Sequence, residues 1–419
     1  MEEWKEYKIS DVIDEISMGP FGSNIKVDNF IVFGVPVLNG SNLQGFKLNE
    51  DSFNYVSQEK ADSLGKANAH RGDVVITHRG TLGQIVYIPE DSKFEQYVIS
   101  QSQFRLKLNK ELIRPDFLVY FFHTRLGQHR IMMNASQVGV PALARPTSTF
   151  KEVSVPVPQM EVQNKVMGIL HSLDDKIEVN RRINDNLEQQ AQALFKSWFV
   201  DFEPFKDGEF VESELGMIPK GWKVREASDI FEINIGKTPP RKESQWFSSS
   251  KDDNIWVSIA DMGVSGLFIS DSKEYLTDDA INKFNIQLVE ENTVLLSFKL
   301  TIGRVSIADS RLTTNEAIAR FVLPANYYRE FLYLYLKQYN YSNLGSTSSI
   351  ATAVNSKTIK TMKLLVPTIE VLSCFSSISN KMFEKIKYLQ RESSRLSSLR
   401  DTLLPRLMSG ELRINDISV

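Results

Sequence analysis

An internal duplication constrains the fold of this chain more than any other feature of its sequence. Residues 81–83 (Thr-Leu-Gly) align with residues 301–303 (Thr-Ile-Gly), and far upstream Trp4 aligns with Trp222. The matches have low identity, but they keep their order along both halves. A repeat that spans a whole half of the chain is a structural unit of its own. We therefore interpret the chain as a tandem duplication of one module.

The best-matched stretch reads as a hairpin in both halves. Residues 71–88 alternate a β-rich run, a glycine-bearing turn and a second β-rich run, and residues 290–307 repeat this order. The Thr and the second Gly are shared, whereas Arg79 is exchanged for Lys299 and the first glycine is lost. We expect the turn of the second hairpin to be altered for this reason.

Length and composition place the chain among ordinary globular proteins. With 419 residues it exceeds one typical domain, so we expect roughly two to four domains. Apolar content of 42%, one cysteine (Cys374) and a charged start suit a core-forming cytoplasmic protein without disulfides or a signal peptide. No run reaches the ~20 apolar residues of a membrane span. The net charge of −3 argues against a free-standing, non-specific nucleic-acid binder.

Each half divides into a mixed α/β module and a helical segment. Short β-rich runs with turn residues surround one helical stretch, at residues 114–132 in the first half and 326–340 in the second. The predicted domains are a first module at 1–158, a first helical region at 159–205, a second module at 206–367 and a second helical region at 368–419.

The helical regions carry an apolar seam with alternating spacings of three and four residues, which is typical of a helix that pairs with another helix. The first seam comprises Val162, Val166, Leu170, Leu173, Ile177, Leu187, Ala191, Leu194 and Trp198. The second comprises Phe375, Met382, Ile386, Leu389, Leu396, Leu403 and Leu407. Each helix would be ~60 Å long. A module separates them, so the second helix can run back along the first, and we predict an α/β (α+β) fold whose two helices form an antiparallel coiled coil with pseudo-two-fold symmetry.

Polar residues interrupt both seams. Asn180 and Asn184 lie on the first seam, and Ser393 occupies the position on the second that matches Asn184. They are either local imperfections or devices that fix the register of the helix pair, a role for which buried polar residues are known.

Motifs of catalysis are not found in the sequence. It has no phosphate-binding glycine loop, no dinucleotide fingerprint and no Cys/His cluster with metal spacing. Four histidines (His70, His78, His123 and His129) lie in the first module, and none has a counterpart in the second. Because a catalytic group in only one of two copies would be unusual, we expect a chain without a catalytic centre, resident cofactor or metal.

Two related modules on a rigid spacer suit a target that is itself two-fold in its backbone. Duplex DNA has antiparallel strands, so each module could read one half-site in equivalent orientation. Modules that have diverged would read different half-sites. The sequence therefore favours an asymmetric, bipartite DNA site, with the helix pair setting the distance between its halves.

Four stretches resemble specificity subunits of type I restriction-modification systems. These are residues 193–205 (ALFKSWFVDFEPF), 399–412 (LRDTLLPRLMSGEL), 19–26 (GPFGSNIK) and 72–83 (GDVVITHRGTLG), and the resemblance covers the whole chain. It implies two target recognition domains and a bipartite site in double-stranded DNA. It also implies two methyltransferase subunits that use S-adenosylmethionine to modify adenine, and restriction subunits that use ATP and Mg²⁺, with catalysis confined to these partners.

Candidate DNA-binding residues are loop side chains with hydrogen-bond donors or bidentate capacity, since Arg and Lys suit guanine and phosphate and Asn and Gln suit adenine. In the first module they are Ser23, Asn24, Lys26, Asn39, Ser41, Asn42, His78, Arg79, Thr81, Gln84, Gln137 and Arg145. In the second they are Lys237, Thr238, Arg241, Lys242, Lys299, Thr301, Arg304, Ser346 and Ser348. For each, the alternative is a solvated loop side chain.

The ends of both helical regions are richer in large apolar residues than a two-helix seam needs. The set comprises Leu194, Phe195, Trp198, Phe199, Phe202 and Phe205, with Leu403, Leu404 and Leu407 in the second half. These residues either pack the helix end on a module or form the surface on which methyltransferase subunits dock.

Two rival interpretations stay open. The chain could be a non-catalytic scaffold whose helices and modules bind protein partners, which salt-sensitive and sequence-dependent DNA binding would exclude. It could also be the specificity part of a single-chain restriction enzyme, although the charged start and the complete repeat argue against a truncated chain.

Overall fold

The computed structural model describes residues 4–22, 24–133, 135–136, 141–341 and 354–412. The candidate residues Ser23, Gln137, Ser346 and Ser348 lie outside these ranges. The chain forms two compact units: unit 1 comprises residues 1–176 and 395–419, and unit 2 comprises residues 177–394. Each is described by itself.

Unit 1 is built on two four-stranded sheets. The first has the order β2 (Ile13–Met18), β9 (Gln103–Leu108), β6 (Val74–Thr77), β7 (Ile85–Tyr87), and the second β4 (Asn54–Val56), β3 (Val35–Val37), β8 (Gln96–Val98), β5 (Asn68–His70). Two further pairs are β1 (Lys5–Lys8) with β12 (Ser154–Val157) and β10 (Ala135–Ser136) with β11 (Ala142–Leu143). Every residue of β6 is buried, as its β-branched sequence favours.

The helices of unit 1 are short, apart from the parts of two long helices described below. They are α1 (Ile9–Val12), α2 (Gln58–Ser63), α3 (Pro115–His123), α4 (Arg125–Met132) and α5 (Pro146–Lys151). Helix α3 packs on the first sheet at β7. Pro115 at its first position suits a helix start, because no hydrogen bond is lost there.

Unit 2 has sheets of five and four strands. The first has the order β16 (Glu232–Ile235), β24 (Ile318–Val322), β21 (Val294–Ser297), β22 (Val305–Ala308), β19 (Phe268–Ile269), and the second β17 (Phe247–Ser248), β20 (Tyr275–Leu276), β18 (Asn254–Val257), β23 (Thr313–Thr314). Two further antiparallel pairs are the hairpin of β13 (Phe210–Ser213) with β14 (Gly216–Pro219) and the long-range pair of β15 (Lys223–Glu226) with β25 (Lys363–Val366). The short helices are α7 (Ile259–Met262), α8 (Asp278–Phe284), α9 (Arg329–Gln338) and α10 (Ser356–Lys360).

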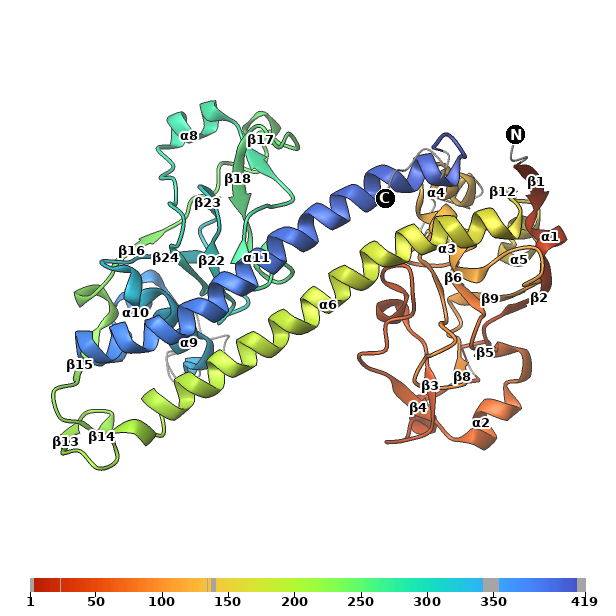
Figure 1. Ribbon diagram of the computed structural model, residues 1–419. Coiled ribbons are helices and arrows are strands. Elements are labelled where there is room, and N and C mark those ends of the chain that lie inside the picture. The colour runs from red at the N-terminus through yellow and green to blue at the C-terminus, as the bar shows by residue number, and fades with distance from the viewer. Residues whose placement is uncertain (1–3, 23, 134, 137–140, 342–353, 413–419) are drawn as a thin grey trace. The chain divides into compact units, whose positions relative to one another are not determined.

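The two units repeat one topology, so the predicted duplication of a mixed α/β module is confirmed. The order β2-β9-β6-β7 corresponds to β16-β24-β21-β22. In both second sheets one pair of strands is parallel: Val37 pairs with Val98 in unit 1, and Trp256 pairs with Thr313 in unit 2. Helix α9 packs on β21 and β22 (Figure 1) as α3 packs on β7.

Two long helices, α6 (Met160–Phe199) and α11 (Ile369–Met408), contribute residues to both units. In unit 1, Val162, Val166 and Leu170 of α6 share a core with Leu404 and Leu407 of α11. In unit 2 the core includes residues from both helices as well. The predicted seam positions Val162, Val166, Leu170 and Leu407 therefore face inward, whereas Leu404 is buried without belonging to the predicted seam. No helix in the described ranges is both long and apolar enough to cross a membrane.

The polar positions of the seam differ from one another. Asn180 is fully buried in unit 2, and its Nδ2 donates to Glu392 Oε2 at 2.7 Å and to Ser393 Oγ at 3.3 Å. Within the described ranges the Oδ1 atoms of Asn180 and Asn184 are buried without a hydrogen-bond partner.

The apolar set at the helix ends is packed inside the units. Phe195 and Phe199 are buried in the core of unit 2, where the ring of Phe199 lies 4.8 Å from that of Phe375. Leu194, Trp198, Phe202 and Phe205 pack against the same core, and Leu403, Leu404 and Leu407 belong to or pack against the core of unit 1. The docking-surface interpretation is wrong for the buried side chains Phe195, Phe199, Leu404 and Leu407, because a partner cannot reach them.

Candidate nucleic-acid interface

Three chain segments of unit 1 meet beside the predicted hairpin, residues 78–84. The Gly19 N–H donates to the Gln103 carbonyl at 2.8 Å, and the His78 N–H donates to the Ser102 carbonyl at 2.9 Å. The hairpin is closed by the N–H of Thr77, which donates to the Gln84 carbonyl at 2.9 Å. We call this junction of the hairpin with the segments around 19 and 101–103 the first hub.

Unit 2 contains the same junction, built from corresponding positions. Gly236 N–H donates to the Ile318 carbonyl at 3.2 Å, and Phe298 N–H donates to the Ala317 carbonyl at 2.9 Å. Ser297 N–H closes the hairpin 298–304 on the carbonyl of Arg304 at 2.9 Å. This second hub matches the first bond for bond, so the duplication preserves the backbone of the loops on which most candidate residues lie.

The expected change in the turn of the second hairpin is wrong for its two left-handed positions. In the first hairpin Gly80 and Gly83 have φ of +88° and +80°. In the second, Gly303 has φ of +90° and Leu300, which stands where the glycine was lost, still has φ of +60°. Both left-handed positions are therefore kept, although leucine does not favour this conformation. The hydrogen bonds inside the turns differ, since the Leu82 N–H donates to the Gly80 carbonyl and the Gly303 N–H to the Ser297 carbonyl.

Most candidate residues of the first module lie on loops around the first hub. Arg79 and Thr81 are exposed on the hairpin, and the Thr81 hydroxyl donates to Gln84 Oε1 at 2.7 Å. The loop 39–41 approaches them, because a Cβ on Gly40 would lie 3.7 Å from both Thr81 Oγ1 and Gln84 Oε1. Exposed residues elsewhere on these loops are Asn24, Lys26, Asn39, Ser41 and Arg145.

His78 contributes a neutral imidazole to the first hub. Its Nε2–H donates to the Gln101 carbonyl at 3.1 Å. Burial lowers the pKa of His78 below its usual value of 6.5, and the neighbouring charge of Arg79 acts in the same direction. A neutral ring that donates from Nε2 keeps Nδ1 as an acceptor.

Asn42 is corrected by the structure from a DNA contact to a loop-shaping residue. Its side chain is 1% exposed. The amide Nδ2 donates to the carbonyls of Asn49 and Ser52, both at 3.0 Å, and Oδ1 accepts from the Asn39 N–H at 2.9 Å. These three bonds use the side chain fully within the protein and present the loop 39–41.

Two candidate cations of the second module, Lys237 and Arg241, already bind neighbouring groups of the protein. Lys237 Nζ donates to the carbonyls of Phe284 and Asn285 at 3.2 and 3.1 Å. Arg241 pairs with Glu274 at 2.9 Å and its guanidinium lies 4.4 Å from the ring of Trp256. To contact DNA, these side chains would first have to leave partners that they already have.

The remaining candidates of the second module divide by position. Lys242, Lys299 and Thr301 are exposed, and the Lys299 ammonium lies 5.7 Å from the ring of Phe298. Arg304 is half-buried, and its Nη1 donates to the Ile259 carbonyl at 2.6 Å. This bond attaches the hairpin to α7, and the DNA contact expected of Arg304 stays a prediction. Thr238 is half-buried and its hydroxyl donates to Glu316.

Two exposed residues of the hubs were not predicted from the sequence. Gln101 lies beside Gly22, whose Cβ would fall 2.2 Å from Gln101 Oε1, and Glu316 occupies the corresponding position in the second hub. Gln suits adenine and Glu suits the amino group of cytosine. Both residues could have been found from the sequence by continuing the alignment of the two halves past the hairpins, where Gln101 and Glu316 correspond.

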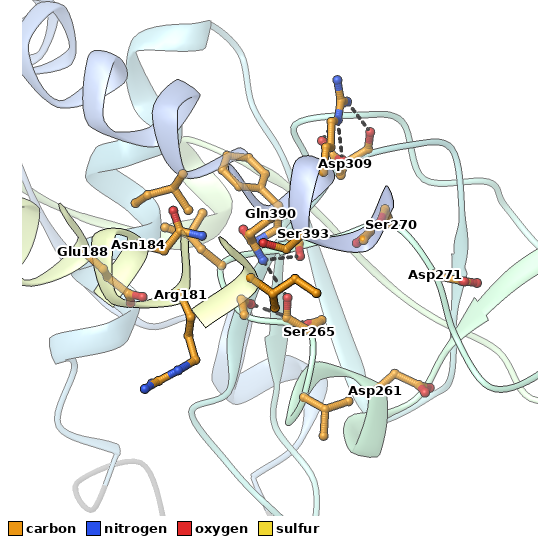
Figure 2. Close-up of a pocket in the computed structure, with 18 of the residues that line it drawn as sticks. Arg181, Asn184, Glu188, Asp261, Ser265, Ser270, Asp271, Asp309, Gln390 and Ser393 are labelled. Atoms are coloured by element: carbon orange, nitrogen blue, oxygen red, sulfur yellow. Dashed lines mark hydrogen bonds and ion pairs between the residues drawn. The ribbon is translucent and has the colours of Figure 1, made fainter. Parts of the chain in front are cut away.

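A cavity of about 550 Å³ lies in unit 2 (Figure 2). Residues of α6, of the loops around 261–273 and of α11 line it, among them Arg181, Asn184, Asp271 and Gln390. Gln390 bridges its wall, since Nε2 donates to the Ser265 carbonyl at 2.7 Å and Oε1 accepts from the Phe268 N–H at 3.1 Å. The cavity thus borders the attachment of the module to α11.

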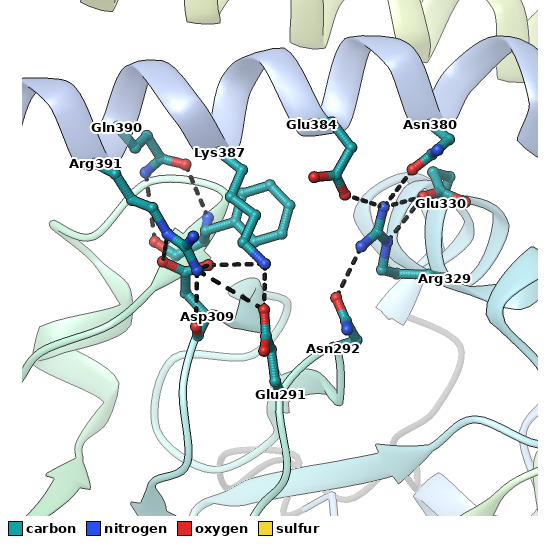
Figure 3. Close-up of polar contacts among 11 residues, drawn as sticks. Glu291, Asn292, Asp309, Arg329, Glu330, Asn380, Glu384, Lys387, Gln390 and Arg391 are labelled. Carbon is teal, nitrogen blue, oxygen red and sulfur yellow. Dashed lines mark hydrogen bonds and ion pairs between the residues drawn. The ribbon is translucent and has the colours of Figure 1, made fainter.

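Two polar clusters complete this attachment (Figure 3). In one, the Asp309 carboxylate forms ion pairs with Lys387 at 3.1 Å and with Arg391 at 2.8 Å. In the other, Arg329 contacts Asn380 at 2.6 Å and Glu384 at 2.9 Å. Because both clusters join the module to α11, they fix the second hub relative to that helix. The described residues contain no group of three or more His, Cys, Asp or Glu side chains that could hold a metal ion.

Comparison with known proteins identifies the family. The model of the type I restriction modification DNA specificity domain matches residues 1–189 and 219–392. The chain is 27% identical over 480 residues to the type I restriction enzyme HindI specificity subunit of Haemophilus influenzae, covering 98% of this chain and 100% of that protein. It is 28% identical over 434 residues to the MjaIX specificity subunit of Methanocaldococcus jannaschii, covering 99% of this chain and 95% of that one.

The fold has a solved counterpart. The crystal structure of the S subunit of a type I restriction-modification system from M. genitalium is similar, with a TM-score of 0.55 at 15% identity, over 97% of this chain and 96% of that one. At this identity the similarity concerns the fold alone. Since the domain model matches most of the chain in two copies, this protein belongs to the family of type I restriction-modification DNA specificity subunits.

Proposed function

We propose that this chain is the sequence-reading subunit of a type I restriction-modification complex and that it binds an asymmetric, bipartite site in double-stranded DNA. The observation that carries the proposal is the pair of hubs. Three matched backbone hydrogen bonds hold each hub, while the side chains presented there differ between the two. To read two different half-sites, two modules need the same backbone geometry but different polar side chains.

Each hub would read its half-site through a few exposed side chains. Arg79 and Lys299 occupy matching hairpin positions, where the first can bind guanine in a bidentate manner and the second acts as a point charge for phosphate or guanine. Gln101 favours adenine, whereas Glu316 favours cytosine. The proposed recognition domains are 1–158 and 206–367.

We further propose that α6 and α11 form an antiparallel coiled coil that sets the distance between half-sites. Contacts inside unit 2 support this direction: Asn180 meets Ser393, whereas Phe199, later on α6, meets Phe375, earlier on α11. In unit 1, Asp174 pairs with Arg400 at 2.6 Å. As the residue number rises along α6, the number of the residue that it contacts on α11 falls, as expected of antiparallel helices.

Catalysis would belong to partner subunits. Two methyltransferase subunits would bring S-adenosylmethionine and modify adenine, and restriction subunits would bring ATP and Mg²⁺. The role of this chain is to place those enzymes on a chosen sequence. The solvent-facing parts of the long helices, rather than their buried aromatic residues, would then be available for docking.

Mapping adenine methylation across a genome tests the proposal. Cells would co-express this chain with its cognate methyltransferase subunit, and the control would omit this chain. We expect methylation at one asymmetric motif with an unread spacer. Replacing residues 1–155 with those of a relative should change only one half of the motif.

Two results would contradict the proposal. Methylation at a single continuous motif would exclude the two-hub geometry. No methylation despite a stable complex with an active methyltransferase would favour the alternative of a non-catalytic protein scaffold.

A further inference from the structure

Leu300 combines two features that are individually uncommon. Its side chain is 99% exposed, and its backbone is left-handed with φ of +60°. Leucine gains nothing from water contact, and the left-handed region is unfavourable for residues with a bulky side chain. An exposed loop position with positive φ is normally occupied by Gly, Asn or Asp.

The first hairpin has the residue that the conformation favours. Gly80 occupies the position of Leu300, with φ of +88°, and a Cβ added to Gly80 would meet nothing within 4 Å. Both hairpins thus leave open space at this position. Only the second fills it, and it does so with an apolar side chain at a conformational cost.

The hairpin around Leu300 is pinned so that the strained conformation persists. Ser297 Oγ donates to the Thr301 carbonyl at 2.6 Å and accepts from the Arg304 N–H at 3.0 Å. The Gly303 N–H donates to the Ser297 carbonyl at 3.0 Å. Strain that the surroundings hold in place is characteristic of functional positions.

From this geometry we propose that Leu300 is an apolar base contact of the second half-site. The inference rests on the proposed function, and it assigns specificity to a residue outside the polar set. Leu300 lies between the exposed residues Lys299 and Thr301, whereas Ile302 packs against the core of unit 2. A lone apolar side chain beside a cation suits a groove, where Lys299 meets a phosphate and Leu300 meets bases.

Leucine can contact bases in two ways that share this chemistry. It can pack on the methyl group of a thymine, or it can act as a wedge that partly separates two stacked bases. In either case the matching position of the first hub, Gly80, makes no such contact. The two half-sites then differ in readout by apolar as well as polar groups.

Binding of the complex with its methyltransferase subunit to a fluorescent duplex tests the proposal. The duplex carries the motif recovered by methylation mapping. Leu300→Asn removes the apolar group but suits the left-handed backbone, so the thermal stability of the complex should be retained. We expect affinity to fall on the order of tenfold, the size of one lost base contact. Leu300→Met should bind close to wild type, as should Leu215→Asn, which changes a half-exposed leucine elsewhere.

The arms of the experiment separate the two contacts. Replacing thymine by uracil in the second half-site should abolish the difference between wild type and Leu300→Asn if the methyl group is contacted. A 2-aminopurine reporter should brighten with wild type but not with Leu300→Asn if the side chain is a wedge. Either result supports the inference.

Other results would overturn it. These are unchanged affinity of Leu300→Asn, an equal loss on random DNA, or no response in both arms, each with a wild-type complex that still discriminates the motif. If the wild-type complex itself fails to discriminate, the proposed function fails instead.

Discussion

Arg391 of α11 donates two hydrogen bonds to Asp309: Nε lies 2.8 Å from Oδ2 and Nη2 lies 2.9 Å from Oδ1. Asp309 is 6% exposed, and its carboxylate also forms an ion pair with Lys387. Because the carboxylate is buried and meets two cations, this contact differs from an ordinary surface ion pair. It ties the loop after β22 to the long helix.

Asp309→Asn should destabilise unit 2 by about 3 kcal/mol, because two cations would lose a buried carboxylate. Denaturant unfolding followed by far-UV circular dichroism measures the change. Lys220→Ala is the control, since its pair with Glu209 is exposed on both sides and should contribute little. An equal effect of the two variants would show that the cluster does not clamp the module to α11.

Phe199→Ala should lower the free energy of unfolding by about 3–5 kcal/mol, because it leaves a cavity in a packed aromatic core. The ring of Phe199 lies 5.1 Å from that of Phe331 and 5.7 Å from that of Trp222. Val200→Ala, at a half-exposed neighbour, is the control. If Phe199→Ala kept full stability and only weakened binding of the methyltransferase subunit, the burial described above would be wrong.

The elements that the sequence predicts well are those whose signal is local. Helix α6 begins at Met160 and α11 at Ile369, each shortly after a proline, as the seam spacing indicates. The duplication is visible because many weak matches keep their order. Long-range pairing carries no such signal: nothing in the residues around Asp309 indicates that they meet Arg391.

The candidate site shows the same limit. Exposed hairpin residues such as Arg79 follow from turn chemistry, but the inward direction of Asn42 depends on carbonyls of the loop at 49–52. The attachment of Arg304 to Ile259 likewise depends on a distant helix. Leu300 was missed because residue type alone argues against both its exposure and its backbone conformation.

Arg79→Ala and Lys299→Ala should each weaken recognition of a different half-site. Loss of one bidentate or phosphate contact lowers affinity by about 1–3 kcal/mol. Binding competition with duplexes altered in one half at a time measures the effect. Lys60→Ala, at a half-buried position of α2 outside both hubs, is the control. If both variants affected the same half-site, the assignment of one hub to each half would be wrong.

Stability of unit 1 should fall as the pH drops below about 6.5, in part because of His123. Burial lowers its pKa from 6.5, and the charge of Arg400 lowers it further. The unfolded chain therefore binds a proton first, so acid favours unfolding, while stability above that pH is unaffected.

His123→Gln tests this contribution, because glutamine keeps a donor near the Ile85 carbonyl, which accepts from His123 Nε2 at 2.9 Å. The loss of unfolding free energy between about pH 7.5 and about pH 5.5 should be smaller in this variant. His129→Gln, at an exposed position, should follow the wild-type curve. If the unfolding free energy of all three proteins depended on pH in the same way, His123 would not contribute to the loss of stability in acid.

Asn180→Leu should leave the stability of the chain within about 1 kcal/mol of wild type, because the gain from removing a buried Oδ1 that has no partner in the described ranges is offset by the loss of the Nδ2 bonds to Glu392 and Ser393. The two interpretations of the polar seam then separate. Asp309 and Arg391 fix the second module on α11, and the hydroxyl of Tyr333 donates to Glu188 of α6 at 2.9 Å. Since these contacts already fix the helix register, we expect Asn180→Leu to leave the spacer of the methylated motif unchanged. Ser398→Leu, elsewhere on α11, is the control for adding an apolar side chain. A second motif with a different spacer, found only with Asn180→Leu, would instead assign register control to Asn180.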